Sequence, residues 1–258
     1  MRYPREAHAP GPFVLISSHE FAVQKFPLSS SPDRYFVVFS PRMKTLLLAT
    51  RNQHKTAEIR AILGSRHLYL TLNDFPAAPP VVEDADTFAG NAAKKAFEIA
   101  LWLAKNWTLE LDPGAFYVLA DDSGLEVDAL NGAPGVYSAR FAALDTGHPG
   151  NSPDAENNAK LLRLLGDLPP EKRTARFRCV LALAHPADQK LRIQNVECFD
   201  GACEGRIQTV ASGRHGFGYD PLFVPNGFTE SFAELGESVK DRISHRAHAL
   251  VKLKEFLK

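Results

Sequence analysis

Residues 118–127 constrain the fold more than any other stretch of the chain. An apolar run leads into Asp121, Asp122, Ser123 and Gly124, and a second, alternating run follows at once. This pattern predicts a buried strand that delivers two carboxylates to the edge of a sheet, with Gly124 permitting a turn. Neighbouring side chains on an extended chain point to opposite faces, so at most one aspartate faces a given pocket squarely unless the strand turns. A polar turn between two strands is the alternative interpretation.

The length and composition of the chain indicate a globular protein with one large domain or two small ones. Of its 258 residues, 45% are hydrophobic and 23% are charged, which is enough to bury a core. Lys and Arg together number 30, as do Asp and Glu. Because this balance leaves no global field to hold a nucleic acid or an anionic membrane, we expect neither as a partner. No apolar run approaches the roughly 18 residues of a membrane span.

The cysteines argue against a disulfide framework or a zinc site. Cys179, Cys198 and Cys203 are an odd number and lack paired CxxC spacing,. We therefore expect inert or buried thiols in a reducing compartment and predict a cytoplasmic protein.

Residues 1–42 differ from the rest of the chain. They are rich in proline, carry a serine run at 29–31 and show no sustained hydrophobic period. A secretory signal fits them poorly, and we predict a flexible or loosely docked N-terminal extension. Met43 directly precedes the first strong strand, so a biological start at Met43 is the alternative, and the predicted catalytic domain spans 43–258.

A polar link follows this first strand and opens a helix. Residues 51–55 connect the strand to helix-spaced apolar positions, and Gly64 is expected to close the helix,. Such a loop is a natural anion site because free backbone N–H groups and the helix dipole face the ligand. Lys55 and Arg51 add positive charge there, although such basic residues are more often part of a solvated surface. The loop lacks the Walker spacing.

The segment 83–96 is acidic at its start and leads into an Ala-rich helix that extends to about Lys105. Asp86 or Thr87 can cap that helix. The nearby acids complement the dipole of a helix start in one interpretation. In the other, a carboxylate here joins the aspartate pair to hold Mg²⁺ through oxygen ligands, with water and phosphates completing the shell.

The second half of the chain predicts further helices and a strand meander on a mixed sheet. The expected elements are a turn at 131–135, a short helix at 136–141, a helix at 155–165, strands at 174–185, 191–201 and 205–210, and a terminal helix capped by Ser244 with Leu250, Leu253 and Leu257 on its apolar face.

Two polar stretches in this half suit a ligand. Three glycines surround Phe217, and they can bring its ring against a flat molecule while backbone N–H groups face anions,. A glycine-rich loop whose aromatic residues fill the core is the alternative. Lys240, His245 and Arg246 place donors near the start of the terminal helix, where a solvated basic face is the simpler explanation.

Taken together, these stretches resemble the inosine triphosphate pyrophosphatase family, whose members split deaminated purine nucleoside triphosphates. The resemblance runs from about Lys44 to the C-terminus. It is carried by five motifs in the family's order: a phosphate loop at 50–55, the acidic segment at 83–96, the catalytic strand end at 120–125, and base-reading loops at 216–221 and 244–246.

The resemblance implies an α/β fold with an elongated mixed sheet, flanking helices and two lobes around a central nucleotide cleft. It also implies hydrolysis of ITP, dITP and XTP to the monophosphate and pyrophosphate, which cleanses the nucleotide pool, with Mg²⁺ as cofactor and a homodimer as the assembly. A Maf-like pyrophosphatase acting on other modified nucleotides and a non-catalytic nucleotide-binding module are the alternatives.

The resemblance further implies roles for individual residues. Asp122 would activate the attacking water, and Glu83, Asp122 and Asp121 would hold the metal, with the division of roles between the two aspartates left open. The implied substrate-binding residues are Thr50, Arg51, Asn52, Gln53, His54, Lys55, Ser123, Phe217, Gly218, Tyr219, Asp220, Lys240, His245 and Arg246.

A preference for deaminated purine bases would follow from the hydrogen-bond donors of the base-reading loops. His245 and Arg246 would donate to the 6-oxo group of hypoxanthine or xanthine, with Phe217 stacking on the ring. Adenine would present an amino donor to these donors, and each unpaired group costs roughly 1–3 kcal/mol. Two positions depart from the family pattern: Arg51 replaces a common Gly, and Gly90 replaces a common Glu.

Overall fold

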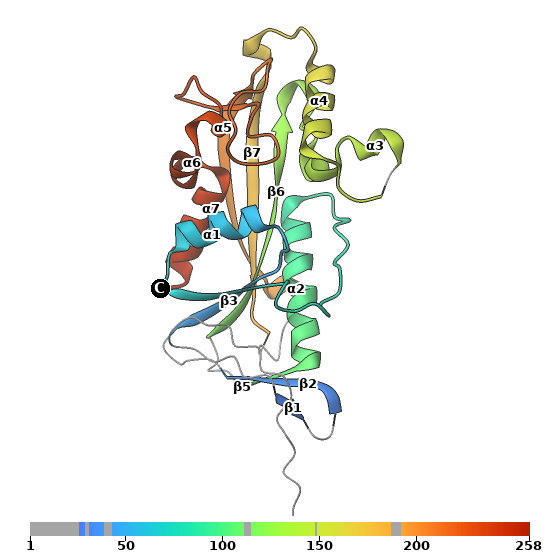
Figure 1. The fold of residues 1–258 in the computed structure, drawn as a ribbon, viewed down its shortest axis with the longest axis vertical. Coiled ribbons are helices and arrows are strands. Elements are labelled where there is room, and N and C mark those ends of the chain that lie inside the picture. Colours follow the sequence, from blue (N-terminus) through green and yellow to red (C-terminus); the bar gives the residue numbers. More distant parts are fainter. Residues whose placement is uncertain (1–25, 29–30, 39–42, 111–114, 148, 187–191) are drawn as a thin grey trace, which may run out of the picture.

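The protein is described by a computed structural model that covers residues 26–28, 31–38, 43–110, 115–147, 149–186 and 192–258. The molecule is elongated, and two long strands, β6 and β7, run along its length (Figure 1). Among the described residues, no helix combines the length and apolar character needed to cross a bilayer.

The main sheet has six strands in the order β4-β3-β6-β7-β8-β9. Strands β4, β3 and β6 are parallel, whereas β6 through β9 pair antiparallel. This arrangement, with helices on its flanks, confirms the predicted mixed sheet. The strands are β3 (Lys44–Leu48), β4 (His67–Thr71), β6 (Phe116–Val127), β7 (Thr174–Ala184), β8 (Glu197–Ile207) and β9 (Phe223–Pro225).

A smaller sheet joins β1 (Phe26–Leu28), β2 (Ser31–Val38) and β5 (Trp107–Glu110). Strand β2 pairs antiparallel with β1 and parallel with β5. The rest of residues 1–42 lies outside the described residues, so the proposed boundary at Met43 stays a prediction.

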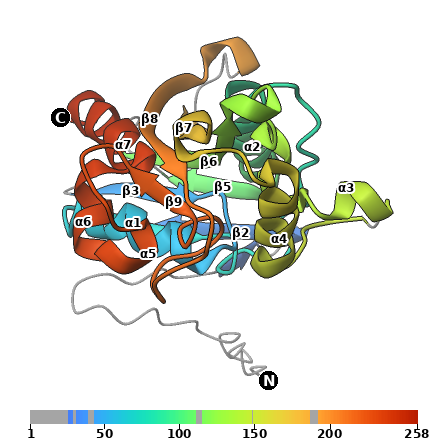
Figure 2. The same ribbon diagram turned by 90° about the horizontal axis from the view of Figure 1, so that it is seen from above.

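Helices cover both faces of the main sheet, as Figure 2 shows from above. Helix α2 (Phe88–Asn106) packs on the face that carries Val118 and Ala120. Helices α1 (Gln53–Leu63) and α7 (His245–Phe256) pack on the opposite face, which carries Leu119 and Leu181. The alternation along β6 follows from the twofold period of a strand.

The long strands carry the chain into a second lobe. Strand β3 pairs with β6 only as far as Leu119, whereas β6 continues to Val127 beside β7 and β8. The second lobe has its own core, which includes Leu125, Phe177 and Phe223. The remaining elements are η1 (Asp128–Leu130), η2 (Gly135–Arg140), α3 (Ala143–Thr146), α4 (Asp154–Leu165), η3 (Pro170–Lys172), η4 (Ile193–Asn195), α5 (Phe232–Leu235) and α6 (Glu237–Ile243).

The predicted helix ends at Gly64 and Ser244 are confirmed. The Asn52 side chain caps α1 by accepting from Lys55 N at 3.1 Å, and Gly64 ends the helix with a φ of 77°. At the start of α2, Thr87 Oγ1 accepts from Gly90 N at 3.0 Å, so Thr87 rather than Asp86 makes the cap contact,. Ser244 caps α7 as expected.

The prediction that the strand ends at the aspartate pair is wrong. Strand β6 runs without interruption through Asp121 and Asp122, which pair with Leu181 and Val180 of β7. Gly124 makes no turn there: a Cβ at this position would overlap the Ser138 hydroxyl, the Gly135 carbonyl and the Phe88 ring. The glycine is required because the chain of η2 packs directly against the strand.

The predicted strands at 191–201 and 205–210 are one strand that begins later. Strand β8 starts at Glu197 and stays paired with β7 through Arg206. Residues 193–195 form the 3₁₀ turn η4 instead of extended chain. Gly201 and Gly205 lie inside β8 because α7 and β9 pack closely over them,. In the sequence, the same glycines had indicated a gap between two strands.

Candidate active site

The site forms where β3 ends and β6 loses its neighbour. Ala49 N donates to Leu119 O at 2.8 Å, and the chain then leaves the sheet to enter α1. Beyond Leu119 the edge of β6 is not paired with β3. Side chains on both faces of β6 can therefore meet at this edge, which lies between the two lobes.

Asp121 lies inside a buried network of ion pairs on the α1 and α7 side. Lys55 Nζ lies 2.5 Å from Asp121 Oδ1, and Arg246 Nε lies 2.8 Å from Oδ2. The Ser123 hydroxyl donates to Oδ1 at 2.9 Å, and the Cys179 thiol donates to Oδ2 at 3.3 Å. Burial alone would raise the pKa of Asp121, but Arg246 and Lys55 hold it well below its usual range. Asp121 is therefore ionised and fully engaged.

The network continues through a residue that the sequence did not single out, Glu58 of α1. Glu58 pairs with Arg246 and, at 2.8 Å, with Lys240, whose Nζ also lies 2.5 Å from Asp220 Oδ2. Burial would raise the pKa of Glu58, but Arg246 and Lys240 lower it. The only available signal was its position three residues after Lys55, which places both side chains on one helix face.

Asp122 lies on the opposite face, in a different environment. It is 6% exposed, and its Oδ2 has no hydrogen-bond partner among the described residues. Burial raises the pKa of Asp122 to about 6, and the nearby Glu83 carboxylate adds to this effect. The opposite orientations of the two aspartates agree with the expectation from strand geometry.

Lys95 of α2 connects the two sides, and the sequence did not single it out either. Its Nζ lies 2.6 Å from Glu83 Oε1 and donates to the backbone carbonyl of Asp121 at 3.2 Å. Arg140 holds the Glu83 carbonyl from the second lobe at 3.2 Å. Of the neighbouring acids, Asp84 pairs with a surface lysine instead, so Glu83 is the acid of this segment that approaches Asp122.

The carboxylates at this edge of the sheet are the groups that could hold a metal ion. In the described part of the chain, no three His, Cys, Asp or Glu side chains are grouped to hold one. Glu83 and Asp122 nevertheless form a pair of carboxylates with one buried, unpartnered oxygen. Mg²⁺ is commonly bound by one or two carboxylates, with waters and substrate phosphates completing its shell. The pair fits such an ion, whereas both oxygens of Asp121 are already engaged.

A cavity of about 170 Å³ lies beside the network, between the lobes. His245 lines it, is 4% exposed, and stacks on Phe177 with ring centroids 4.7 Å apart. Burial, together with the charges of Arg246 and Lys240, holds the pKa of His245 well below its usual range. Its imidazole is neutral and offers one donor and one acceptor. The predicted binding residues that line this cavity are Asn52, Lys55, Ser123, Phe217, Gly218, Tyr219, Asp220, Lys240, His245 and Arg246.

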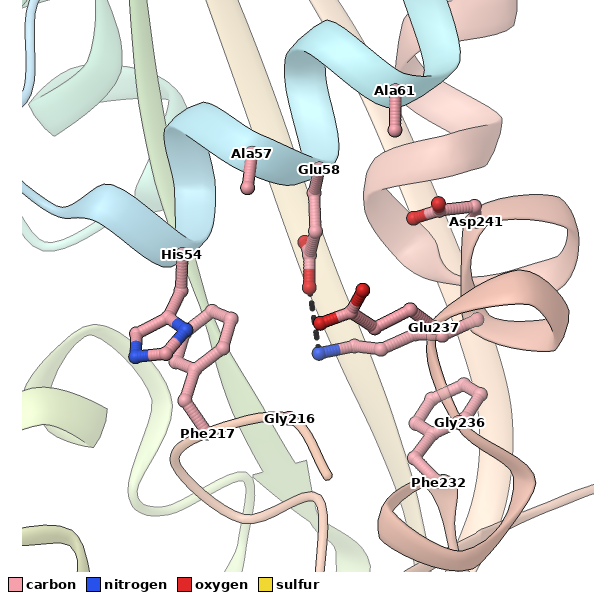
Figure 3. Close-up of a pocket in the computed structure, with 11 residues that line it drawn as sticks. His54, Ala57, Glu58, Ala61, Gly216, Phe217, Phe232, Gly236, Glu237 and Asp241 are labelled. Atoms are coloured by element: carbon pink, nitrogen blue, oxygen red, sulfur yellow. Dashed lines mark ion pairs between the residues drawn. The ribbon is translucent and has the colours of Figure 1, made fainter. Parts of the chain in front are cut away.

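Four predicted binding residues do not line this cavity. Thr50 Oγ1 accepts from Asn52 N at 3.0 Å, and Gln53 begins α1. Arg51, which replaces the common Gly, donates to Ala78 O at 3.2 Å. His54 lines a smaller cavity of about 70 Å³, shown in Figure 3.

The guanidinium of Arg246 makes its hydrogen bonds with Asp121, Glu58 and Ser123. The idea that it donates to a purine oxygen stays a prediction, and these contacts favour a role in organising the network instead. The second departure from the family pattern also has a local explanation. A Cβ at Gly90 would lie 2.7 Å from the Ala85 methyl, so Ala85 occupies the space that a larger residue would need.

Comparisons with known proteins give one consistent result. The sequence profile described as the Ham1 family matches residues 46–256. A dITP/XTP pyrophosphatase of Shouchella clausii is 44% identical over 215 residues, which cover 83% of this chain and 97% of the relative. The enzyme of the same name from Desulforamulus reducens is 48% identical over 213 residues, covering 82% and 94%.

Solved structures of similar proteins give the same result. A HAM1 protein from Coxiella burnetii superposes with a TM-score of 0.67 at 33% identity, covering 83% of this chain and 98% of its own. A nucleoside-triphosphatase / dITP/XTP pyrophosphatase from Mycobacterium abscessus gives 0.59 at 39% identity, covering 81% and 98%.

Proposed function

The chain belongs to the Ham1 family, and we infer from this membership that it is a hydrolase of the nucleoside triphosphate pyrophosphatase type. It cleaves deaminated purine nucleoside triphosphates to the monophosphate and pyrophosphate. The single structural observation that supports this conclusion is the Asp122 and Glu83 pair, which lies close to Lys55, a residue that lines the cavity between the lobes. The matches do not support a Maf-like enzyme or a non-catalytic module.

The phosphates are bound at the start of α1. Helix N-termini attract phosphate through free N–H groups and the helix dipole. Lys55 adds a full charge in the first turn and lines the cleft beside Asn52. Asp121 holds Lys55 at 2.5 Å and so positions this cation before substrate arrives,.

We propose Mg²⁺ as the cofactor, held by Glu83 and Asp122. When bound, it neutralises charge on the phosphates. Lys95 contacts Glu83 and the backbone of Asp121, and it adds a second positive charge at the same edge of the sheet.

Asp122 serves as the base. In the metal-free protein its pKa is raised to about 6, so its carboxylate is ionised at neutral pH and is a stronger base than Asp121,. It takes the proton of a water whose oxygen attacks phosphorus, and the bond to the leaving pyrophosphate breaks. Asp121 is unsuited to this role because its carboxylate is held ionised by two cations.

The base is recognised in the larger cavity. Phe217 offers an aromatic face, and the neutral His245 offers a donor to a 6-oxo group,. Adenine would leave such a donor facing an amino group, with the buried polar group unpaired.

We also propose a homodimer, which rests on the family resemblance alone, and a cytoplasmic location. The location rests on the three cysteines, which are free thiols in the described structure,.

The test is pyrophosphate release from ITP, dITP, XTP, ATP, GTP and dTTP, with Mg²⁺ and with excess EDTA. We expect release from the deaminated purines to exceed that from ATP by about two orders of magnitude, and EDTA to abolish it. Comparable rates on ITP and ATP would reject the specificity. Absence of release from every nucleotide would reject the activity, and undiminished release in EDTA would reject the metal.

A further inference from the structure

His54 stands out because it touches the purine site without lining it. It lies in the first turn of α1 and is exposed to solvent. Its imidazole stacks on the Phe217 ring, with centroids 5.2 Å apart and planes 17° from parallel. Figure 3 shows the two rings overlapping at one end of the smaller cavity.

Phe217 separates the two cavities. It lines both the larger cavity and the smaller one, as does Lys240, whereas His54 lines only the smaller one. Phe217 is thus within reach of a base in the larger cavity, and His54 contacts its ring from the smaller one.

The backbone around Phe217 is fixed by the second lobe. Phe217 N donates to Asp220 Oδ2 at 2.8 Å, and Gly218 N donates to Asp154 Oδ2 at 2.6 Å. These bonds fix the backbone and leave the χ angles of the ring free. The ring is held by its side-chain neighbours, which include His54, the Lys240 ammonium 4.5 Å from its centroid and the Arg246 guanidinium 5.9 Å from it.

We propose that His54 is a positioning residue for purine recognition: its imidazole holds the Phe217 ring in the orientation that stacks on the base. This role rests on the proposed function and goes beyond contact with the phosphates, the role usual for a residue of this loop. It also makes the stack a contact between the lobes, since His54 belongs to α1 and Phe217 to the loop fixed by α4.

The role predicts a change in binding rather than in chemistry. Without His54, Phe217 must be ordered when the base binds, and the cost falls equally on the ground state and the transition state. An aromatic pair of this kind corresponds to roughly two- to tenfold in affinity. KM should therefore rise while kcat stays nearly constant.

The experiment compares His54→Ala with His54→Phe, which keeps a stacking ring but no ring nitrogen. His215→Ala is the matched control, because His215 is an exposed histidine that lines neither cavity. Pyrophosphate release from ITP gives KM and kcat. Inhibition by IMP, which carries the base, and by pyrophosphate, which does not, separates the two ends of the site.

We expect His54→Ala to raise KM for ITP and the inhibition constant of IMP by roughly two- to tenfold, with pyrophosphate inhibition unchanged. His54→Phe and His215→Ala should match the wild type. The inference is overturned if His54→Ala leaves IMP inhibition unchanged, if it weakens pyrophosphate inhibition equally, or if His54→Phe or the control is as impaired. A wild-type protein that releases no pyrophosphate from ITP would reject the proposed function itself, which is a distinct outcome.

Discussion

Two adjacent aspartates in one strand have opposite chemical environments. Asp121 is held ionised by Lys55 and Arg246, whereas burial and Glu83 raise the pKa of Asp122 to about 6. The strand places them on opposite faces, so each meets a different set of helices. These neighbours support the proposed division of roles, in which Asp121 positions cations and Asp122 exchanges a proton.

Replacing Asp122 by Asn should abolish turnover yet stabilise the metal-free fold. Since the folded-state pKa is about 6, above the unfolded value, the folded chain binds more protons between about pH 4 and pH 6. Stability therefore falls as the pH rises through that window and stays lower above it. The neutral amide of Asn does not pay the cost of a buried charge. The free energy of unfolding of the variant should therefore exceed that of the wild type by on the order of 3 kcal/mol at about pH 8 and by almost nothing at about pH 4.

Urea unfolding in EDTA at both pH values measures this effect, together with pyrophosphate release in Mg²⁺. Asp84→Asn is the control, because Asp84 is exposed and pairs with Lys94 on the surface. Near-normal turnover in Asp122→Asn would remove its catalytic role, and equal stability at both pH values would remove the account of its environment.

Replacing Glu58 should lower the free energy of unfolding, although Glu58 was not predicted as a site residue. Glu58→Gln leaves Arg246 and Lys240 without one of their buried partners, which should cost about 3 kcal/mol in the free energy of unfolding. Urea denaturation checks this value. Glu255→Gln, whose carboxylate pairs with Lys258 in solvent, should change stability little, and a similar loss in both variants would contradict the network.

Motif residues were predictable from sequence, but their partners were not. Lys55, Asp122 and Phe217 lie in stretches whose composition already suggested a ligand. Glu58 and Lys95 lie on ordinary helices, and only packing of α1 and α2 against β6 brings them to the site. A charged residue on a helix normally faces solvent, so no local pattern distinguished these two.

At the scale of elements, the start of α2 shows two positions that depend on each other: the Ala85 methyl group fills the space that a side chain at Gly90 would need. Gly90→Ala alone should destabilise the protein by about 1–2 kcal/mol, because its Cβ would meet the Ala85 methyl at 2.7 Å and crowd the Thr87 cap,. With Ala85→Gly also present, the same change should be neutral or stabilising, since alanine favours a helix over glycine.

A double-mutant cycle by urea unfolding measures the coupling between positions 85 and 90. The expected coupling is about 1–2 kcal/mol. Strictly additive effects would show that Ala85 does not limit what position 90 can carry.

Helix ends were easier to predict than strand ends. Gly64 ends a helix and Ser244 begins one through contacts within a few residues, and such contacts can be read from sequence. The ends of β6 and β8 depend on neighbouring strands far away in the chain. Polar residues and glycines in the sequence therefore predicted strand ends at positions where β6 and β8 stay paired with β7.

At the scale of the whole molecule, the two lobes share three strands instead of a linker. The resemblance to a family predicted this architecture, and composition alone allowed one domain or two. The separate cores around Leu47 and Leu125 explain why the hydrophobic composition did not distinguish one domain from two.

Deleting residues 1–42 should leave kcat/KM for ITP within about twofold of the full chain. The family match begins at residue 46, and the predicted site residues begin at Thr50. Pyrophosphate release together with circular dichroism measures the outcome. A large loss of activity in a truncated protein that still folds would give these residues a functional role.

The uninterrupted course of β6 and β7 has a consequence for how the enzyme can move. Domain closure usually concentrates its dihedral changes in a few loop or terminal residues, but these strands remain hydrogen-bonded to each other from one lobe into the other. We therefore expect the floor of the cleft to be stiff, so that Asp121 and Asp122 should keep their places when a nucleotide binds. On this view, substrate entry and release would require movement of the loops and helices around the cleft, while the proposed catalytic geometry is already present in the free protein.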